Sequence, residues 1–290
     1  MNLLVNGILL GLGYCLISIG MALIVGVAKV LDLAYCIYYT IAVYVVFILL
    51  KTLPPVIPIW GLFMVGIGSA AVIALLVHYF LVLPTRKEPH AVLISTVAIC
   101  MVVQELLIFK EGSEPVYFPM ILKGATNLFG VWTTNQMILV AIITIATITS
   151  LWVLLNKTRL GLAIRATADQ PEAVQLAGGN IKHIRLIAGA LAGIVAGIGA
   201  VFLSPIYPPH PLMWLDTVII AFAVIVLGGL GSIWGCIPAA LILGISEVAI
   251  AIYLPYGGIV KRAVGLVIIF LVLLFRPTGL LGVKGWEEAQ

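Results

Sequence analysis

The chain has 290 residues, of which 63% are hydrophobic and 9% are charged, and its formal net charge is +4. Soluble domains carry about 45–50% apolar and about 25% charged residues, so this composition excludes an ordinary water-soluble fold. The small positive charge lies mainly in loops, which indicates membrane topology rather than binding to nucleic acid. We therefore predict an all-α polytopic membrane protein, surrounded by lipid, that forms one domain over residues 1–290.

Hydrophobic segments follow one another along the whole chain. A helix needs about 20 apolar residues to cross the ~30 Å hydrocarbon layer. The nine segments lie at 4–27, 36–52, 57–83, 90–110, 135–156, 184–205, 216–230, 234–254 and 259–275. The seventh is short, because LGGLGS at 227–232 interrupts it. We therefore expect eight or nine membrane-spanning segments that include short or broken helices.

Basic residues are distributed unevenly between the two sides of the membrane. Under the order of nine segments, the loops at 84–89 and 157–185 and the C-terminal tail lie on one side, and they carry most of the lysines and arginines. By the positive-inside rule this side is cytoplasmic. We expect a multi-pass protein of a prokaryotic plasma (inner) membrane, with the N-terminus outside and the C-terminus in the cytoplasm.

Glycines recur at helical spacing in two of the segments. Gly189, Gly193 and Gly197 lie four residues apart, and Gly7 and Gly11 share the same spacing in the first segment. Small residues at this spacing let helix backbones approach closely in lipid. Helix packing is the favoured interpretation of these glycines, and a substrate path along their faces is the alternative.

Two interruptions of the apolar pattern lie in separate halves of the chain, at 26–40 and 224–238. Transporters often place their sites where helices are broken at corresponding positions of two halves. Polar groups inside a membrane are costly and are therefore functional candidates. The candidates for a translocation path are Asp32, Tyr35, Gln104, Gly228, Gly229 and Glu247.

Simpler interpretations exist for two of these candidates. Asp32 can form an ion pair with Lys29 at the membrane surface. Glu247 can be a buried polar residue that only bonds to a neighbouring helix. The sequence leaves these alternatives open.

One long, charged and helix-prone stretch, at 158–185, interrupts the apolar chain. In DQPEAVQLAGG, Asp169 is in position to cap a helix, and Glu172, three residues on, completes a capping box. Gly178 and Gly179 supply a left-handed stop. The pattern predicts a helix of about eight residues, which is too short to be stable alone.

This short helix must therefore dock on something. The preceding TRLGLAIRATA, which contains Arg165, can form a second short amphipathic helix. One interpretation is an interfacial helix that lies on the membrane with its basic residues toward lipid phosphates. The other is a docking element for a soluble partner, with the exposed apolar face as the contact.

The same residues carry a resemblance to a known family. PEAVQLAG resembles the EAA-type loop of ABC-importer permeases, with Glu172, Ala173 and Gly178 at the expected spacing. Together with LGGLGSIWG at 227–235 and RPTGLLG at 276–282, the chain resembles the permeases of branched-chain amino acid importers, the LivH/LivM-like family, over nearly its whole length. The resemblance implies an ABC-importer permease architecture.

The sequence also departs from that family. Many members have a stretch like asparagine-phenylalanine-alanine-histidine-glycine after the first helix, where this chain has DLAYC. Asp32 replaces the asparagine, and Tyr35 replaces the histidine. In the EAA-type motif, Val174 stands where a second alanine is usual.

The resemblance implies a set of partners for this chain. They are a second permease subunit (a related chain or a second copy), two cytoplasmic ATPase subunits and an extracytoplasmic substrate-binding protein. Loop 157–185, with Arg165, Asp169, Glu172, Ala173 and Gly178, would be the element that couples to the ATPases. The implied cargo is a branched-chain or other small amino acid. A permease for urea or short amides, and an ion-coupled secondary transporter, remain alternatives.

Motifs for chemistry within this chain are missing from the sequence. It has no G-x-x-x-x-G-K-[ST] phosphate loop and no G-x-S-x-G nucleophile motif. Its four histidines have no metal-ligand spacing. We therefore expect a transporter subunit with no catalytic residues, metal or cofactor of its own, whose ATP is hydrolysed by partner subunits.

Overall fold

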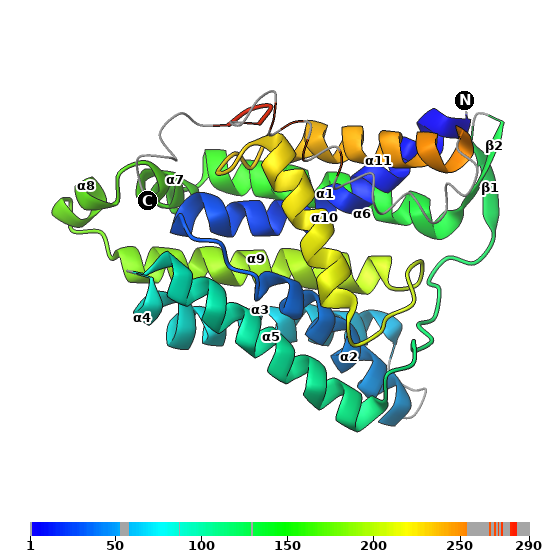
Figure 1. Cartoon of the computed structure of the whole chain (residues 1–290), viewed down its shortest axis with the longest axis horizontal. Coiled ribbons are helices and arrows are strands. Elements are labelled where there is room, and N and C mark those ends of the chain that lie inside the picture. Colours follow the sequence, from blue (N-terminus) through cyan, green and yellow to red (C-terminus); the bar gives the residue numbers. More distant parts are fainter. Residues whose placement is uncertain are drawn as a thin grey trace.

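The computed structural model describes residues 2–52, 58–86, 88–128, 130–253 and 279–282, and the single positions 267, 270, 272 and 274. Most of the long helices lie side by side along the longest axis of the molecule, and α10 crosses them obliquely (Figure 1). Within the described residues, seven helical segments are long and apolar enough to cross a membrane, and α10 is a shorter apolar helix. The prediction of an all-α polytopic fold is confirmed.

The helices follow the apolar segments of the sequence closely. In chain order the elements are α1 (Asn2–Ala28), α2 (Tyr35–Thr52), α3 (Ile59–Val77), η1 (His78–Val82), α4 (Leu83–Thr85), α5 (Pro89–Glu111), β1 (Ala125–Leu128), β2 (Val131–Thr134), α6 (Asn135–Lys157), α7 (Arg159–Asp169), α8 (Pro171–Leu176), α9 (Ile181–Leu203), α10 (Met213–Gly228) and α11 (Cys236–Tyr253). The first eight predicted segments correspond to helices whose ends shift by three residues at most. The ninth, 259–275, lies almost entirely outside the described residues.

The third span is long and changes its winding near one end. After α3 the chain makes a π-helical turn, η1, before the short α4. Pro84 in α4 has no N–H, and its ring crowds the carbonyl of Phe80 four residues earlier. The wider π-turn directly before the proline accommodates this gap in the hydrogen-bond ladder.

Glycines set the close helix contacts of the bundle. A Cβ added to Gly11 of α1 would lie 2.8 Å from the Cα of Leu241 in α11. A Cβ added to Gly193 of α9 would lie 2.8 Å from the carbonyl oxygen of Ala70 in α3. These contacts confirm the predicted packing role, because the backbones approach more closely than any side chain would allow.

The two ends of the molecule carry different structures. The short helices α7 and α8 and the end of α4 lie at one end, and the hairpin of β1 and β2 lies at the other (Figure 1). Loops 84–89 and 157–185, which the sequence assigns to one side, thus lie at the same end of the molecule. Which of the two ends faces the cytoplasm stays a prediction.

The β-hairpin was not predicted from the sequence. Its strands pair antiparallel, with Ala125 opposite Thr134 and Leu128 opposite Val131. Gly130 in the turn has a φ of 83°, which suits a tight connection. In β2, Val131 and Thr133 are buried and alternate with exposed neighbours, so the strand has one inward face.

Candidate functional site

The turn from α6 to α7 begins loop 157–185. The Thr158 hydroxyl accepts a hydrogen bond from the backbone N–H of Gly161 at 3.0 Å and so caps α7. A Cβ on Gly161 would lie 2.2 Å from the carbonyl oxygen of Leu154 and 2.4 Å from that of Leu155. Only glycine permits so close an approach of α7 to the end of α6.

The amphipathic helix predicted for TRLGLAIRATA is confirmed as α7. Its inward face buries Gly161, Ile164 and Thr167, whereas Arg165 is exposed. The inward face packs against α6, α9 and α1, so the helix is held to the bundle on one side only.

The cap predicted for α8 is wrong. Asp169 is the last residue of α7, and Gln170 is the N-cap of α8, with no hydrogen bond from its side chain to the helix. Glu172 therefore lies one position too early for a capping box. The cause is Pro171, because a proline restricts the preceding residue to extended backbone and makes Gln170 the break between the two helices.

The predicted stop of α8 at Gly178 and Gly179 is confirmed. Gly178 has a φ of 83°. Its N–H donates to the carbonyl of Gln175 at 3.0 Å, and the N–H of Gly179 donates to that of Val174 at 2.8 Å. This pair of bonds is a Schellman motif. A Cβ on Gly179 would lie 2.6 Å from the Cγ1 of Val174, so this close contact requires a glycine. At Gly178 the positive φ is the reason for a glycine.

The surface of α8 is almost entirely uncovered. Leu176 is 91% exposed, and Glu172 and Ala173 are exposed beside it. The loop is also shorter than predicted, because residues 181–185 form the start of α9. Asn180 caps that helix by accepting from the N–H of His183 at 3.3 Å.

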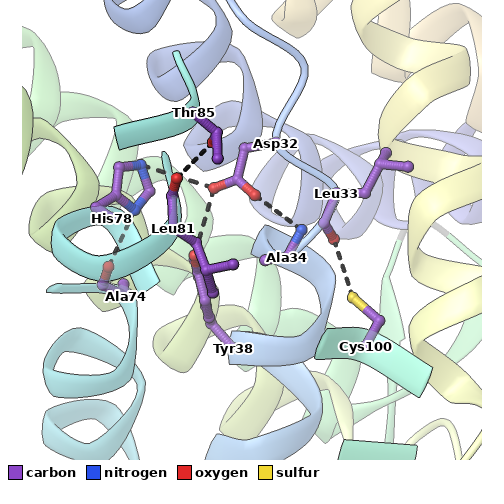
Figure 2. Close-up of polar contacts among 9 residues, drawn as sticks. All are labelled: Asp32, Leu33, Ala34, Tyr38, Ala74, His78, Leu81, Thr85 and Cys100. Carbon is purple, nitrogen blue, oxygen red and sulfur yellow. Dashed lines mark hydrogen bonds and ion pairs between the residues drawn. The ribbon is translucent and has the colours of Figure 1, made fainter. Parts of the chain in front are cut away.

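The first helix break, residues 29–34, is organised by a buried carboxyl group. Asp32 is fully buried and accepts hydrogen bonds from the backbone N–H of Ala34 at 2.9 Å and from the Tyr38 hydroxyl at 3.3 Å. The Nε2 of His78 lies 3.6 Å from the same carboxyl group. Figure 2 shows these groups converging on Asp32 from the break, from α2 and from η1.

The predicted surface ion pair between Asp32 and Lys29 is wrong. Lys29 is exposed and has a φ of 54°, the one positive value among the described residues other than glycine. This left-handed residue turns the chain inward, so that Asp32 points at His78. Burial raises the pKa of the Asp32 carboxyl group above its usual range, and the nearby His78 opposes this shift.

The second helix break, residues 229–235, is organised by backbone contacts. A Cβ on Gly228 would lie 2.6 Å from the carbonyl carbon of Gly235. Gly229 and Gly231 have φ values of 105° and 84°. Gly228 is buried in the protein, as irregular backbone within a membrane must be.

A segment from the C-terminal motif closes the end of α10. The N–H groups of Leu280 and Leu281 donate to the carbonyls of Leu227 and Gly228, both at 2.9 Å. A Cβ on Gly279, which has a φ of 73°, would lie 2.6 Å from the Cα of Gly229. Residues 279–281 of RPTGLLG thus pack on LGGLGSIWG, although the sequence gives no sign of this contact.

Of the remaining path candidates, Tyr35 directly follows the first break, whereas Gln104 and Glu247 lie apart from both breaks. Gln104 of α5 accepts a hydrogen bond from the indole N–H of Trp214 in α10 at 2.7 Å. Glu247 of α11 accepts from the Tyr14 hydroxyl of α1, which fits its simpler interpretation. Tyr35 is fully buried.

The candidates therefore do not gather around one cavity. A cavity of about 10 Å³ next to Tyr14 and Tyr207 has room for one water molecule at most. Asp32 and Gly228 belong to the two breaks, whereas Gln104 and Glu247 connect helices. The sequence also missed His78, which no motif or metal-type spacing distinguishes.

A bundle of long apolar helices with two internal breaks and an exposed helix pair at one end defines a multi-pass membrane protein. Among solved structures, PsaBC from Streptococcus pneumoniae in complex with Fab has a similar fold, with a TM-score of 0.52 and 11% sequence identity over 96% of this chain and 93% of that chain. At this identity the likeness concerns the fold alone.

Sequence comparison then gives the family. The family described as "Branched-chain amino acid transport system / permease component" matches residues 3–276. The permease protein BraD of Pseudomonas aeruginosa, from a high-affinity branched-chain amino acid transport system, is 29% identical over 96% of this chain and 94% of its own length. LivH of Escherichia coli (strain K12) is 28% identical over 96% of this chain and 94% of its own length. A probable LivH of Methanocaldococcus jannaschii is 29% identical over 95% of this chain and 90% of its own length.

The chain belongs to this family of permease components. It is a multi-pass membrane protein and the permease subunit of an ABC importer. The alternative of an ion-coupled secondary transporter is therefore set aside. The family supports a transport component that works with a partner ATPase and a binding protein.

Proposed function

We propose that this permease carries a branched-chain or similarly small amino acid into the cell, and that α7 and α8 couple it to cytoplasmic ATPases. The complex would contain a second permease chain (a relative or a second copy), two ATPase subunits and an extracytoplasmic binding protein. The N-terminus and the β-hairpin end would then lie outside. ATP would be hydrolysed by the partner subunits, with no cofactor in this chain.

The exposed face of α8 is the observation that supports coupling. An isolated helix of six residues is far below the length that is stable in water. Yet α8 is built with a Schellman motif at its end, and Leu176 is 91% exposed beside Ala173. A well-defined short helix with an uncovered apolar face fits a partner surface better than it fits solvent.

The connection between α8 and α9 gives such docking a mechanical consequence. Only residues 177–180 separate the two helices, and two of them form the Schellman stop. A displacement of α8 by a moving ATPase would therefore be passed to α9. Since α9 packs against α1, α2 and α3, its movement would shift the bundle between alternative states of access.

The test replaces Gly178 with valine and uses Gly130→Val as a matched control. Both glycines have a φ of 83°, and an added Cβ at either position meets no atom within 4 Å. Each change therefore costs about 1–2 kcal/mol through the backbone alone, at opposite ends of the molecule. We expect Gly178→Val to lose ATPase co-purification or substrate-stimulated ATP hydrolysis, and Gly130→Val to retain both. If Gly178→Val couples normally, α8 is only an interfacial helix.

The cargo requires a separate experiment. The relatives named above are permeases of branched-chain amino acid systems, which favours leucine, isoleucine or valine over urea and short amides. In proteoliposomes that contain the complete transporter, an excess of unlabelled leucine should reduce the uptake of labelled isoleucine, whereas urea and acetamide should not. Competition by urea alone would assign the permease to the amide group instead.

A further inference from the structure

An aspartate and a histidine face each other in the interior of the helix bundle. Asp32 is 0% exposed and His78 is 2% exposed. Their Nε2 and Oδ2 atoms are 3.6 Å apart, a distance typical of an ion pair rather than of a hydrogen bond. A charge buried this deeply is tolerated only when it is paired or neutralised. The proton content of the pair therefore determines whether the arrangement is stable.

The other ring nitrogen of His78 shows where its first proton lies. Nδ1 is 3.0 Å from the carbonyl oxygen of Ala74. A carbonyl oxygen only accepts, so Nδ1 carries a hydrogen. In a neutral ring, Nε2 would then present its lone pair to Asp32. An ionised Asp32 opposite a neutral His78 would place two acceptors against each other without water between them.

The neighbouring groups do not replace the missing proton. From α2, the Tyr38 hydroxyl donates to Oδ2. From α5, the thiol of Cys100 donates to the carbonyl oxygen of Leu33 at 3.7 Å and not to Asp32. Within the described residues, no lysine or arginine forms an ion pair with Asp32.

We propose that Asp32 and His78 form a proton-binding site, in which either Oδ2 of Asp32 or Nε2 of His78 carries a proton at neutral pH. The bound proton joins the first helix break to the π-turn of the third span, because Asp32 belongs to the break and His78 begins η1. Depending on its position, the pair is an imidazolium with a carboxylate or a neutral ring with a carboxylic acid. Both forms remove the clash between acceptors.

The site also touches the helix that follows α8. A Cβ added to Gly189 of α9 would lie 2.7 Å from the Cγ of His78, so the imidazole ring rests directly on the α9 backbone. Arg185 of α9 is buried one helical turn before Gly189, and it forms no ion pair with Asp32. If α9 moves as the proposed function requires, it slides along the ring. Only this sliding movement depends on the proposed function.

The test is nitrogen-15 NMR of the histidine side chains in the full-length permease, purified into lipid nanodiscs at neutral pH. The chain has four histidines, and His78→Gln assigns the signals of His78. We expect a doubly protonated ring, or a ring with hydrogen on Nδ1 accompanied by the infrared carbonyl band of a protonated Asp32. That band should disappear in Asp32→Asn. A neutral His78 beside an ionised Asp32 would overturn the proposal.

A second pair in the chain supplies a matched control. His210 and Asp216 lie 3.5 Å apart at the surface, with side chains that are 33% and 38% exposed. Asp32→Asn should change the signals of His78, and Asp216→Asn should leave them unchanged. Identical His78 signals in wild type and Asp32→Asn would also sink the proposal. None of these measurements uses transport or ATP hydrolysis. Their outcome therefore tests the proton-binding site even if the proposed function is wrong.

Discussion

The two helix breaks are stabilised by different kinds of contact. The second lies against the end of α1, just before the first break, since a Cβ on Gly26 would lie 3.2 Å from the carbonyl oxygen of Gly231. At the first break, a side chain supplies the hydrogen-bond partner of the backbone, because the Asp32 carboxyl group accepts from the N–H of Ala34. At the second, the N–H groups of Leu280 and Leu281 donate to the last carbonyls of α10, and the uncharged Ser232 hydroxyl accepts from the N–H of Gly235 at 3.1 Å.

This difference shows two ways to keep an irregular backbone inside a membrane protein. Unpaired N–H and C=O groups are too costly to expose to lipid, so both breaks must find partners within the protein. A break that relies on a carboxylate is sensitive to charge and pH. A break that relies on glycines is sensitive to volume. Substitutions at each break and a change of pH should separate these two sensitivities.

Removal of the carboxyl group should have the largest effect. Asp32→Ala leaves Nε2 of His78 and the N–H of Ala34 without their partner in a buried place. Breaking one side of a buried pair costs about 3–5 kcal/mol. Equilibrium unfolding in detergent should show this loss of stability, and Asp32→Asn, which keeps an acceptor for the Ala34 N–H, should lose much less. Equal stability of Asp32→Ala and wild type would contradict the charge-based account of this break.

Added volume should damage the second break. A Cβ on Gly235 would lie 2.2 Å from the carbonyl oxygen of Gly228, a contact that backbone must move to relieve. Overpacking of this kind costs about 1–3 kcal/mol. Gly235→Ala should therefore reduce the yield of folded protein and its melting temperature. Gly68→Ala is the control, because a Cβ there meets no atom within 4 Å. A loss in both variants would point to a general intolerance of alanine instead.

The first break should respond to pH, and the second should not. Burial raises the pKa of Asp32 in the folded protein, whereas the unfolded value is about 3.9. Its contribution to stability is thus fully present below about pH 4 and is lost as the pH rises through the folded pKa. The slope reaches about 1.4 kcal/mol per pH unit for one proton. Melting curves of wild type minus Asp32→Asn should show this decline, and a constant difference would refute it.

The smallest effect is expected at the residue that opens the first break. Lys29 has a φ of 54°, which costs about 1–2 kcal/mol for a residue with a Cβ. Lys29→Gly removes this strain but gains entropy in the unfolded chain, so we expect a net stabilisation of up to about 1 kcal/mol. Thermal unfolding would detect it as a raised melting temperature. Lys123→Gly provides the comparison, since Lys123 has no positive φ. A lower melting temperature for Lys29→Gly would mean that its side chain is needed.

Most of the fold was predictable because lipid imposes a simple rule on span length. Apolar runs of about 20 residues had to become helices, and the structure moves their ends by three residues at most. The glycine stop at Gly178 was predictable for a similar reason, since few residues tolerate its backbone angle. The hairpin was missed because its strands are only four residues long.

The candidate site was less predictable, because its contacts join distant parts of the chain. Asp32 stands near Lys29 in sequence, which favoured a local ion pair, but the left-handed turn directs it to His78 in another helix. Nothing in the sequence links these two residues. The error at Asp169 was avoidable. Pro171 restricts Gln170 to extended backbone, and this rule outweighs the capping preference of an aspartate one residue earlier.

The central position of α1 has a consequence for how the protein is made. This helix leaves the ribosome before the other described helices, yet the glycine face that includes Gly11 packs on α11, the last of them to be synthesised. At about 5–20 residues per second, the interval between them is about 10–45 s. Throughout that time the first helix is inserted without its final neighbour. A chain that stops before α11 would leave this face open to lipid, where membrane quality-control proteases can distinguish it from the finished bundle.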